Sequence, residues 1–335
     1  MAKSNYAAWQ INKENFDVNW SDADKLHFFA KYAILAPSGH NTQPWKFSQS
    51  GQTLVVQADR SRVLPYSGVQ ANEPYVSLGA CIETLVLGAQ GFGYGLKIKY
   101  IVKADVIAHI TIAGPTKPVP VLLDAITERV SNRYLYDTKA LSPALTSTIT
   151  ACDFKSVAAQ VIADKAGIEY IAEQTSLATH RIFGDKQFRL ELSKWVRNNK
   201  TKQFDGMPGF VQEIPTPPSM LAKHIIKRIN VSKDQSNKDT KRILHSPNLI
   251  LVNIKDDSPT ALLDAGRLYA RICILAQQHG LASSGLGTAI IDPIARDEII
   301  KKLRVTGKPI AIIRVGKAAK AARHTPRWPL SAVSS

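Results

Sequence analysis

The chain has 335 residues, of which 44% are hydrophobic and 21% are charged, proportions typical of a globular protein rather than a disordered one. No apolar run approaches the roughly 20 residues that a membrane-spanning helix needs, which argues against an integral membrane protein. The 43 Lys and Arg residues against 27 Asp and Glu give a formal net charge of +16. Nucleic acid, a membrane surface or a small phosphorylated ligand could each account for that surplus.

The N-terminus and the cysteines narrow the class of protein further. The first residues contain no apolar stretch of the secretory type, so the sequence predicts a cytoplasmic protein. Cys81, Cys152 and Cys273 are scattered without Cys-x-x-Cys spacing, which argues against a disulfide framework and against a metal site. Cys81 lies among apolar residues at helical spacing, and all three cysteines are expected to be core residues.

An amphipathic helix is predicted from about Asp22 to Leu35, and a polar loop follows it at 36–47. The loop reads Ala-Pro-Ser-Gly-His-Asn-Thr-Gln-Pro-Trp-Lys-Phe. Between its two prolines, a rigid turn offers donors and acceptors to a planar heterocycle with polar edges, from Ser38, Asn41, Thr42 and Gln43. The alternative is an Asx-type turn that merely closes the helix.

Two segments repeat along the chain. Residues 79–93 and 266–280 share two glycines, an alanine and a glutamine at one offset of 187 residues (266 minus 79), with apolar residues at helical spacing. A strand-like run precedes each helix, at 54–57 and 249–253, and another follows each, at 106–112 and 309–315. The sequence therefore predicts an α+β fold of two similar halves, with long helices packed on antiparallel or mixed sheets.

The stretch from about Lys194 to His245 has no counterpart in the first half. It contains four prolines and is interpreted as an insertion of loops and short helices. Such an excursion is either a lid over a site or a surface feature without a role.

Basic residues concentrate within this stretch and near the C-terminus. Seven basic residues against two acidic ones lie between Lys223 and Arg242, and no acidic residue follows Glu298. The first cluster contains no aromatic residue and the second only Trp328, whereas nucleic-acid binding is supported by aromatic residues among the charges. Both clusters are interpreted as solvated lid and surface.

The second half carries a concentration of hydrogen-bond donors at Glu128-Arg-Val-Ser-Asn-Arg133. Two arginines beside Ser131 and Asn132 suit a phosphate and its sugar-like chain. The alternative is a cluster of solvated arginines at the start of a helix. Two later segments, Ala282-Ser-Ser-Gly-Leu-Gly287 and Thr325-Pro-Arg-Trp-Pro-Leu330, add glycines that permit close backbone approach to a ligand and a further arginine.

Together these segments resemble the nitroreductase-like FMN-binding superfamily. Loop 36–47 resembles its Pro-Ser-x-x-Asn-x-Gln-Pro-Trp segment, and 129–133 resembles its Arg-x-Ser-x-Arg signature, with one extra residue before Asp137. The superfamily places a segment like 284–287 against the flavin's central ring and a late arginine near the phosphate. Because each segment occurs in only one half, the chain resembles a fused pseudo-dimer with a single FMN site. Within the superfamily it is most similar to the tandem, Acg-type branch, over about residues 22 to 333.

The resemblance implies a set of cofactor-binding residues. Arg129, Ser131 and Arg327 would bind the phosphate and the ribityl chain, Arg133 would lie near the pyrimidine edge of the ring, and a backbone N–H near Leu286 or Gly287 would face the reactive ring nitrogen. The remaining implied residues are Ser38, Gly39, Asn41, Gln43, Asn132, Ser284 and Gly285. No catalytic side chain is required, because flavin chemistry resides in the cofactor, and His40 is not expected to be catalytic.

The resemblance also implies an organisation and a function. We expect an N-terminal arm at 1–21, a first half at 22–124 and a second half at 125–335 with an insertion or lid at 195–245. The implied activity is hydride transfer from NAD(P)H through FMN to a nitroaromatic, a quinone or a similar small-molecule acceptor. The alternative is a flavin-binding or flavin-sequestering protein with a closed lid and little reductase activity. We expect a monomeric pseudo-dimer or a weak homodimer, with no nucleic-acid and no membrane partner.

Overall fold

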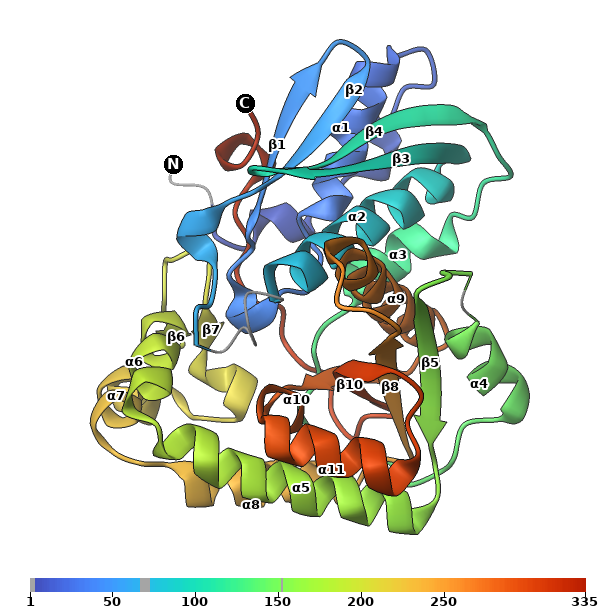
Figure 1. Ribbon diagram of the computed structural model, residues 1–335. Coiled ribbons are helices and arrows are strands. Elements are labelled where there is room, and N and C mark those ends of the chain that lie inside the picture. The colour runs from blue at the N-terminus through green and yellow to red at the C-terminus, as the bar shows by residue number, and fades with distance from the viewer. Residues whose placement is uncertain (1–3, 67–72, 152) are drawn as a thin grey trace.

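The computed structural model describes residues 4–66, 73–151 and 153–335 (Figure 1). Cys152 and the first three residues of the predicted N-terminal arm lie outside the described residues. Cys81 and Cys273 are buried, as predicted for core residues. Within the described part of the chain, none of the helices combines the length and the apolar character needed to cross a membrane.

The first half contains an antiparallel sheet in the order β1-β2-β4-β3. Strands β1 and β2 form a hairpin, and helix α2 connects β2 to β3 and packs against α1. The elements of this half are α1 (Asp22–Ala33), β1 (Trp45–Ser50), β2 (Thr53–Ala58), α2 (Glu73–Gly91), β3 (Tyr94–Lys103), β4 (Val106–Pro115) and α3 (Val121–Glu128).

The second half repeats this arrangement in the order β5-β8-β10-β9. Here α9 connects β8 to β9 as α2 connects β2 to β3, so the predicted duplication and the predicted α+β fold with antiparallel sheets are confirmed. The elements are α4 (Pro143–Thr150), β5 (Val157–Ile162), β8 (Asn248–Ile254), α9 (Pro259–Gln278), β9 (Ala282–Leu286), α10 (Thr288–Ile291), α11 (Pro293–Leu303) and β10 (Lys308–Gly316).

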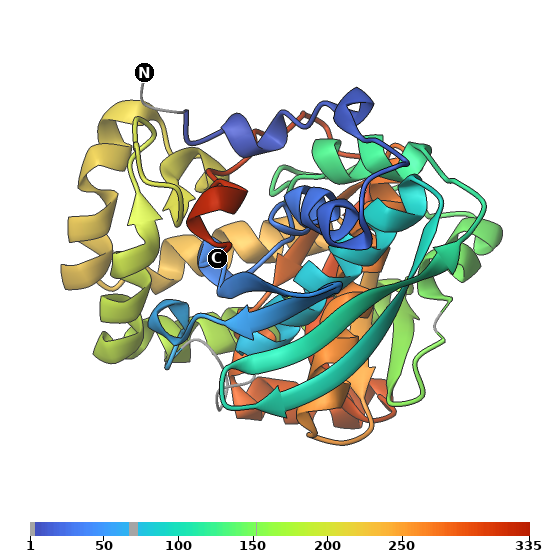
Figure 2. The same cartoon turned by 90° about the horizontal axis from the view of Figure 1, so that it is seen from above.

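The insertion separates β5 from β8, at the position where the first half has only a hairpin turn. Two of its helices lie at one side of the molecule around a small apolar core of their own, and the other two pack into the core of the second half (Figure 1 and Figure 2). It consists of α5 (Lys165–Gly184), α6 (Lys186–Trp195), β6 (Val196–Arg197), β7 (Met207–Pro208), α7 (Thr216–Arg228) and α8 (Ser232–Leu244). The segment between β5 and β8 therefore begins with α5, which packs against α8, α10 and α11. The bounds 195–245 of the insertion stay a prediction.

The two halves meet where α2 crosses α9. A Cβ atom on Gly79 would lie 2.0 Å from the carbonyl oxygen of Leu263, and one on Gly266 would lie 2.0 Å from that of Val76. Both pairs are related by the same offset of 187 residues, so the crossing is close to two-fold symmetric. Beside it, the fully buried carboxylate of Glu83 pairs with two arginines of α9. The repeated glycines thus serve a backbone-to-backbone contact between the halves.

The C-terminal segment returns to the first half. The N–H of Phe47 in β1 donates to the carbonyl of Val333 at 2.7 Å, and Leu330 and Val333 join the core around α1 and α2. The N-terminal arm packs along the same segment, since the Trp9 indole N–H donates to the carbonyl of Thr325 at 2.9 Å. Both ends of the chain therefore cover one side of the first half.

Replacing Gly79 by Ala should lower the free energy of unfolding by about 3 kcal/mol, because the added methyl group would force two helix backbones apart. Gly184→Ala, at the end of α5, is the matched control: its Cβ would meet nothing within 4 Å, and the change should be below about 1 kcal/mol. Denaturant unfolding measures both values. Equal midpoints for Gly79→Ala and the wild type would show that the crossing is not this tight.

Candidate functional site

Loop 36–47 of the first half reaches the boundary with the second half in a strained conformation. His40, Asn41 and Gln43 have φ angles of 48°, 59° and 55°, in the left-handed region that residues other than glycine rarely adopt. Such strain persists only where surrounding contacts impose it, and it is common at binding sites.

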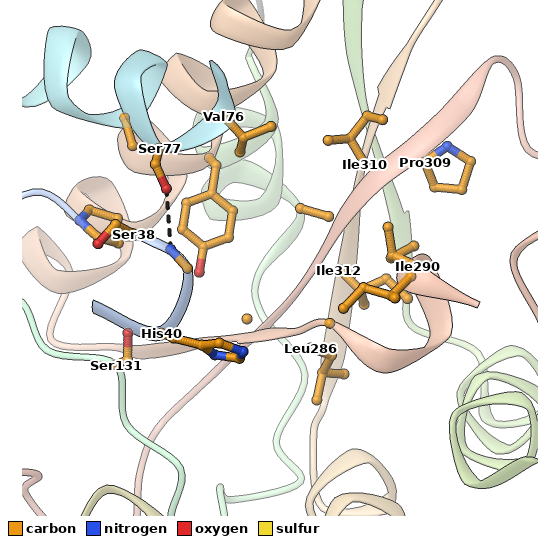
Figure 3. Close-up of a pocket in the computed structure, with 18 of the residues that line it drawn as sticks. Ser38, His40, Val76, Ser77, Ser131, Leu286, Ile290, Pro309, Ile310 and Ile312 are labelled. Carbon is orange, nitrogen blue, oxygen red and sulfur yellow. Dashed lines mark hydrogen bonds between the residues drawn. The ribbon is translucent and has the colours of Figure 1, made fainter. Parts of the chain in front are cut away.

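Hydrogen bonds hold the loop in this conformation. The Gln43 N–H donates to the Ser38 hydroxyl at 3.0 Å, and the Gly39 N–H donates to the Ser77 hydroxyl on α2 at 3.2 Å (Figure 3). The loop is therefore anchored both to itself and to the helix that crosses between the halves.

The two amide side chains of the loop bind other protein segments. The Asn41 amide donates to the carbonyl oxygens of Gly206 in the insertion and Pro326 near the C-terminus, both at 3.0 Å. The Gln43 amide donates to the carbonyl of Phe204 at 2.7 Å. Both side chains thus position the loop, and Asn41 also lines the small cavity described below.

Arg129 and Arg327 lie side by side, 4% and 3% exposed. Arg129 donates to the carbonyl of Leu35 at 3.0 Å, and Arg327 donates to the carbonyl of Ala36 at 3.2 Å and to the side-chain oxygen of Asn41. Burial lowers the pKa of both guanidinium groups, and the Arg129 charge lowers the pKa of Arg327 further. Within the described part of the chain, the Nε atom of Arg327 has no hydrogen-bond partner.

Within residues 4–66, 73–151 and 153–335, this pair of cations has no carboxylate partner, although buried guanidinium groups normally require a negative charge. A small cavity of about 60 Å³ opens beside them and is also lined by Arg133, Ser131 and Trp9. Among the described residues that line it, none is acidic. We call it the anion cavity, because its charge fits a bound anion. The alternative of solvated arginines at 128–133 is wrong for Arg129, since this side chain is buried.

A larger cavity of about 300 Å³ lies between the halves, and we call it the central cavity (Figure 3). Its walls are largely apolar, and its charged lining consists of Arg133, Arg296 and Lys308, with no acidic residue among the described ones. The labelled walls come from the loop, α2, β9, α10 and β10, at Ser38, His40, Val76, Ser77, Leu286, Ile290, Pro309, Ile310 and Ile312. Because Ser38, His40, Ser131 and Arg133 line both cavities, the two form one site with a cationic end and an apolar end.

A third cavity of about 330 Å³, the outer cavity, lies between this site and the insertion. Apolar residues of α6 and α7 line its far side, and Gly285, Leu286 and Gly287 line the side that it shares with the central cavity. His40 and Arg133 therefore lie where all three cavities meet.

Most of the predicted site residues come together here. Those that line the central cavity are Ser38, Gly39, Ser131, Arg133, Gly285, Leu286 and Gly287, and those that line the anion cavity include Asn41, Arg129 and Arg327. Gln43, Asn132 and Ser284 are buried and line neither cavity. The Asn132 amide instead donates to the carbonyl of Lys320 at 2.8 Å, and Ser284 pairs with Arg314 in the sheet.

Sequence reasoning missed several lining residues. Trp9 of the N-terminal arm places its ring 4.9 Å from the Arg327 guanidinium and stacks on His324, with ring centroids 4.0 Å apart. Nothing in the sequence near Trp9 points to the site. Tyr269 and Ser77 line the central cavity from α9 and α2, and their places beside the repeated glycines could have indicated them.

His40 is uncharged at neutral pH. Burial, and to a lesser extent the charge of Arg133, lowers its pKa from 6.5 to about 4. In the unfolded chain the imidazole binds its proton near pH 6.5. Between pH 6.5 and 4 the unfolded state therefore binds more protons than the folded state, and the folded state loses stability as the pH falls through that window.

We expect His40→Gln to reduce this loss. Between pH 6 and 5, the wild-type free energy of unfolding should fall more steeply than that of the variant, by about 1 kcal/mol per pH unit. Denaturant unfolding of ligand-free protein at several pH values measures the two slopes. Parallel curves would show that His40 titrates alike in the folded and unfolded states.

Comparison with known proteins places these features in context. No protein-family model matches the chain. It is 23% identical to the putative NAD(P)H nitroreductase acg of Mycobacterium tuberculosis, over 92% of this chain and 95% of that protein. It is 22% identical to the probable NAD(P)H nitroreductase PigM of a Serratia species, over 88% and 89%.

Among solved structures, the FMN-dependent nitroreductase NfnB from Mycobacterium smegmatis in complex with NADPH is 14% identical, with a TM-score of 0.43 over 64% of this chain and 97% of that chain. The match to the relatives, in contrast, covers 92% and 88% of this chain. The loop, the arginines and the glycine segment that suggested the resemblance also meet at one site. The resemblance is thereby confirmed: this chain is similar, throughout its length, to nitroreductase-like proteins of the Acg type.

Proposed function

We propose that this chain binds FMN and transfers hydride from NAD(P)H, through the flavin, to a nitroaromatic, a quinone or a similar small-molecule acceptor. The observation that carries the proposal is the pair of buried cations, Arg129 and Arg327, at the closed end of a continuous cavity. The names of the relatives acg and PigM, both NAD(P)H nitroreductases, support the same activity.

The anion cavity fits the phosphate of FMN. Guanidinium groups bind phosphate oxygens through N–H donors, and within the described residues neither Arg129 nor Arg327 has a carboxylate partner that would compete with a phosphate. The Nε atom of Arg327, which lacks a hydrogen-bond partner within the described residues, is available to a ligand oxygen. Ser131, between the anion and central cavities, suits the polar chain that joins phosphate and ring.

The central cavity fits a planar ring with polar edges. Val76, Ile310 and Ile312 supply apolar walls, while Arg133 supplies a positive charge at the junction of the cavities. A Cβ on Gly285 would lie 2.7 Å from the Tyr269 hydroxyl, so a side chain there would crowd the wall of the cavity. Glycine at this position keeps the backbone accessible to a ligand.

Bound FMN would supply the hydride chemistry, and the protein supplies binding, orientation and charge. Arg133 would stabilise negative charge that develops at the polar edge of the ring. His40, uncharged at neutral pH, adds no second cation at that point. The outer cavity gives the donor and the acceptor room to approach the shared wall at Gly285–Gly287 in turn, shielded from water by the apolar residues of the insertion.

A second candidate function is flavin binding with little turnover. The Gly206 N–H donates to the Asn41 carbonyl at 3.2 Å, and the Asn5 amide donates to the carbonyls of Thr201 and Gln203 at 3.0 and 2.8 Å. These bonds fasten the insertion over the site and favour a permanently covered cofactor. We infer further that the chain is a monomer, because its two halves already contribute both sides of the site.

Arg129→Met tests the phosphate assignment through two readouts. Affinity for FMN should fall about 10- to 100-fold, because a charge-assisted contact to the phosphate is lost. The free energy of unfolding of the ligand-free protein should rise by about 1–2 kcal/mol, because a buried cation without a carboxylate partner is removed. FMN titration and denaturant unfolding measure the two effects.

Arg242→Met is the matched control, since Arg242 is also 3% exposed but pairs with Asp239 and Glu213. This variant should retain FMN affinity, and its ligand-free form should be less stable than the wild type, because two carboxylates lose their partner. If Arg129→Met bound FMN as tightly as the wild type, the assignment would be wrong.

The two candidate functions differ in how the bound flavin responds to NADPH. For a reductase, anaerobic addition of NADPH should bleach the visible absorbance within seconds, and an added quinone should restore it. For a sequestering protein the absorbance should persist while dithionite still bleaches it. Stopped-flow spectroscopy of the flavin-loaded protein separates these outcomes, and persistence with NADPH would overturn the proposed reductase activity.

A further inference from the structure

Helix α7 of the insertion exposes a row of large apolar side chains. Leu221, Ile225 and Ile229 follow one another at intervals of four residues, and they are 60%, 39% and 57% exposed. Residues four apart lie on the same face of a helix, and the Ile229 N–H donates to the Ile225 carbonyl at 2.7 Å, which continues the helix to this point. Met220, 55% exposed, lies next to the row.

The orientation of α7 is set by the face that it buries against the rest of the insertion. Ser219 and Ala222 are buried, and the helix packs against α6 through this face. Both views place α7 at the outer edge of the molecule (Figure 1 and Figure 2). The row lies beside this buried face, so that Leu221 and Ile229 stay exposed while Ile225 also lines the outer cavity.

The charge around this row has one sign. Lys223, Lys227 and Arg228 are exposed on α7, and Lys233 follows at the start of α8. Between Ile214 and Asp234 the chain contains no acidic residue. At 100° per residue, Arg228 lies beside the apolar row, whereas Lys223 and Lys227 lie on the opposite side of the helix. Apolar residues on one side and cations on the other are the composition of helices that lie in the interface of a bilayer containing anionic lipid.

Other occupants fit this face less well. In a symmetric contact with a second copy of the chain, the cations of one α7 would face those of the other. Nucleic acid would use the cations but leave the apolar row exposed to water. An anionic lipid surface uses both features at once.

We propose that α7 lays its outer face on a membrane surface that carries anionic lipid. Leu221, Ile225 and Ile229 would enter the boundary between headgroups and acyl chains, while Lys223, Lys227 and Arg228 would contact lipid phosphates. The sequence alone predicted no membrane partner, because it could not distinguish exposed apolar residues of α7 from core residues. Ile225 also lines the outer cavity. When α7 is docked, this helix alone would separate that cavity from the lipid.

Co-sedimentation with vesicles tests the proposal. The full chain should bind vesicles made of equal parts phosphatidylglycerol and phosphatidylcholine, bind those of phosphatidylcholine alone far less, and dissociate as the salt concentration rises. The double variant Leu221→Glu/Ile229→Glu should lose binding by at least about tenfold. Neutralising Lys223, Lys227 and Arg228 should weaken it by about fivefold for each cation removed.

Ile294→Glu is the matched control, because Ile294 on α11 is 59% exposed and lies outside the insertion. It should bind vesicles like the wild type. Circular dichroism and FMN content establish that the variants are folded, and vesicle binding is expected with and without flavin, so this proposal and the proposed function fail separately. Absence of binding to anionic vesicles, undiminished binding of the double variant, or retention on duplex DNA without vesicle binding would each overturn the proposal.

Discussion

The close crossing of α2 and α9 is the contact on which the rest of the molecule depends. Gly79 and Gly266 let each helix approach a backbone carbonyl of the other, so the two sheets flank a single pair of helices. The same helices hold the walls of the central cavity, since Ser77 anchors the strained loop and Tyr269 faces it from the other half. A wider crossing would separate the loop from the arginines.

Positive charge without a protein partner is the second constraint. The fully buried Glu83 is matched by two arginines of α9, and the fully buried Arg314 donates to the Ser246 hydroxyl and lies over the Tyr136 ring. Within the described residues Arg129 and Arg327 have no carboxylate partner, and the adjacent loop is held in left-handed backbone conformations. The ligand-free protein is therefore less stable than it would be without these features, and binding of an anion would offset that cost. Preorganised binding sites commonly lower the stability of the free protein in this way.

Much of this could be predicted from sequence, because the repeat carries its own flanking strands and because the loop and Arg129–Arg133 are unusual combinations of residues. A one-dimensional pattern does not reveal which partner a side chain contacts in the folded chain. Gln43 has the residue type of a ligand contact, and its amide donates to the carbonyl of Phe204. Trp9 reaches the site only because the arm follows the C-terminal segment. Helix α5 carries ordinary amphipathic periodicity, which does not indicate that it packs against α8, α10 and α11.

The path of the C-terminal segment has a consequence for how the protein is made. Arg327 bonds to the carbonyl of Leu35 across 292 residues of chain, and Phe47 pairs with residues beyond 330. During synthesis the first half emerges from the ribosome with one edge of its sheet and one wall of the anion cavity missing. Such long-range closure is slow and comes late in folding. The sheet of the first half and the anion cavity are therefore completed only after the last segment of the chain has been synthesised.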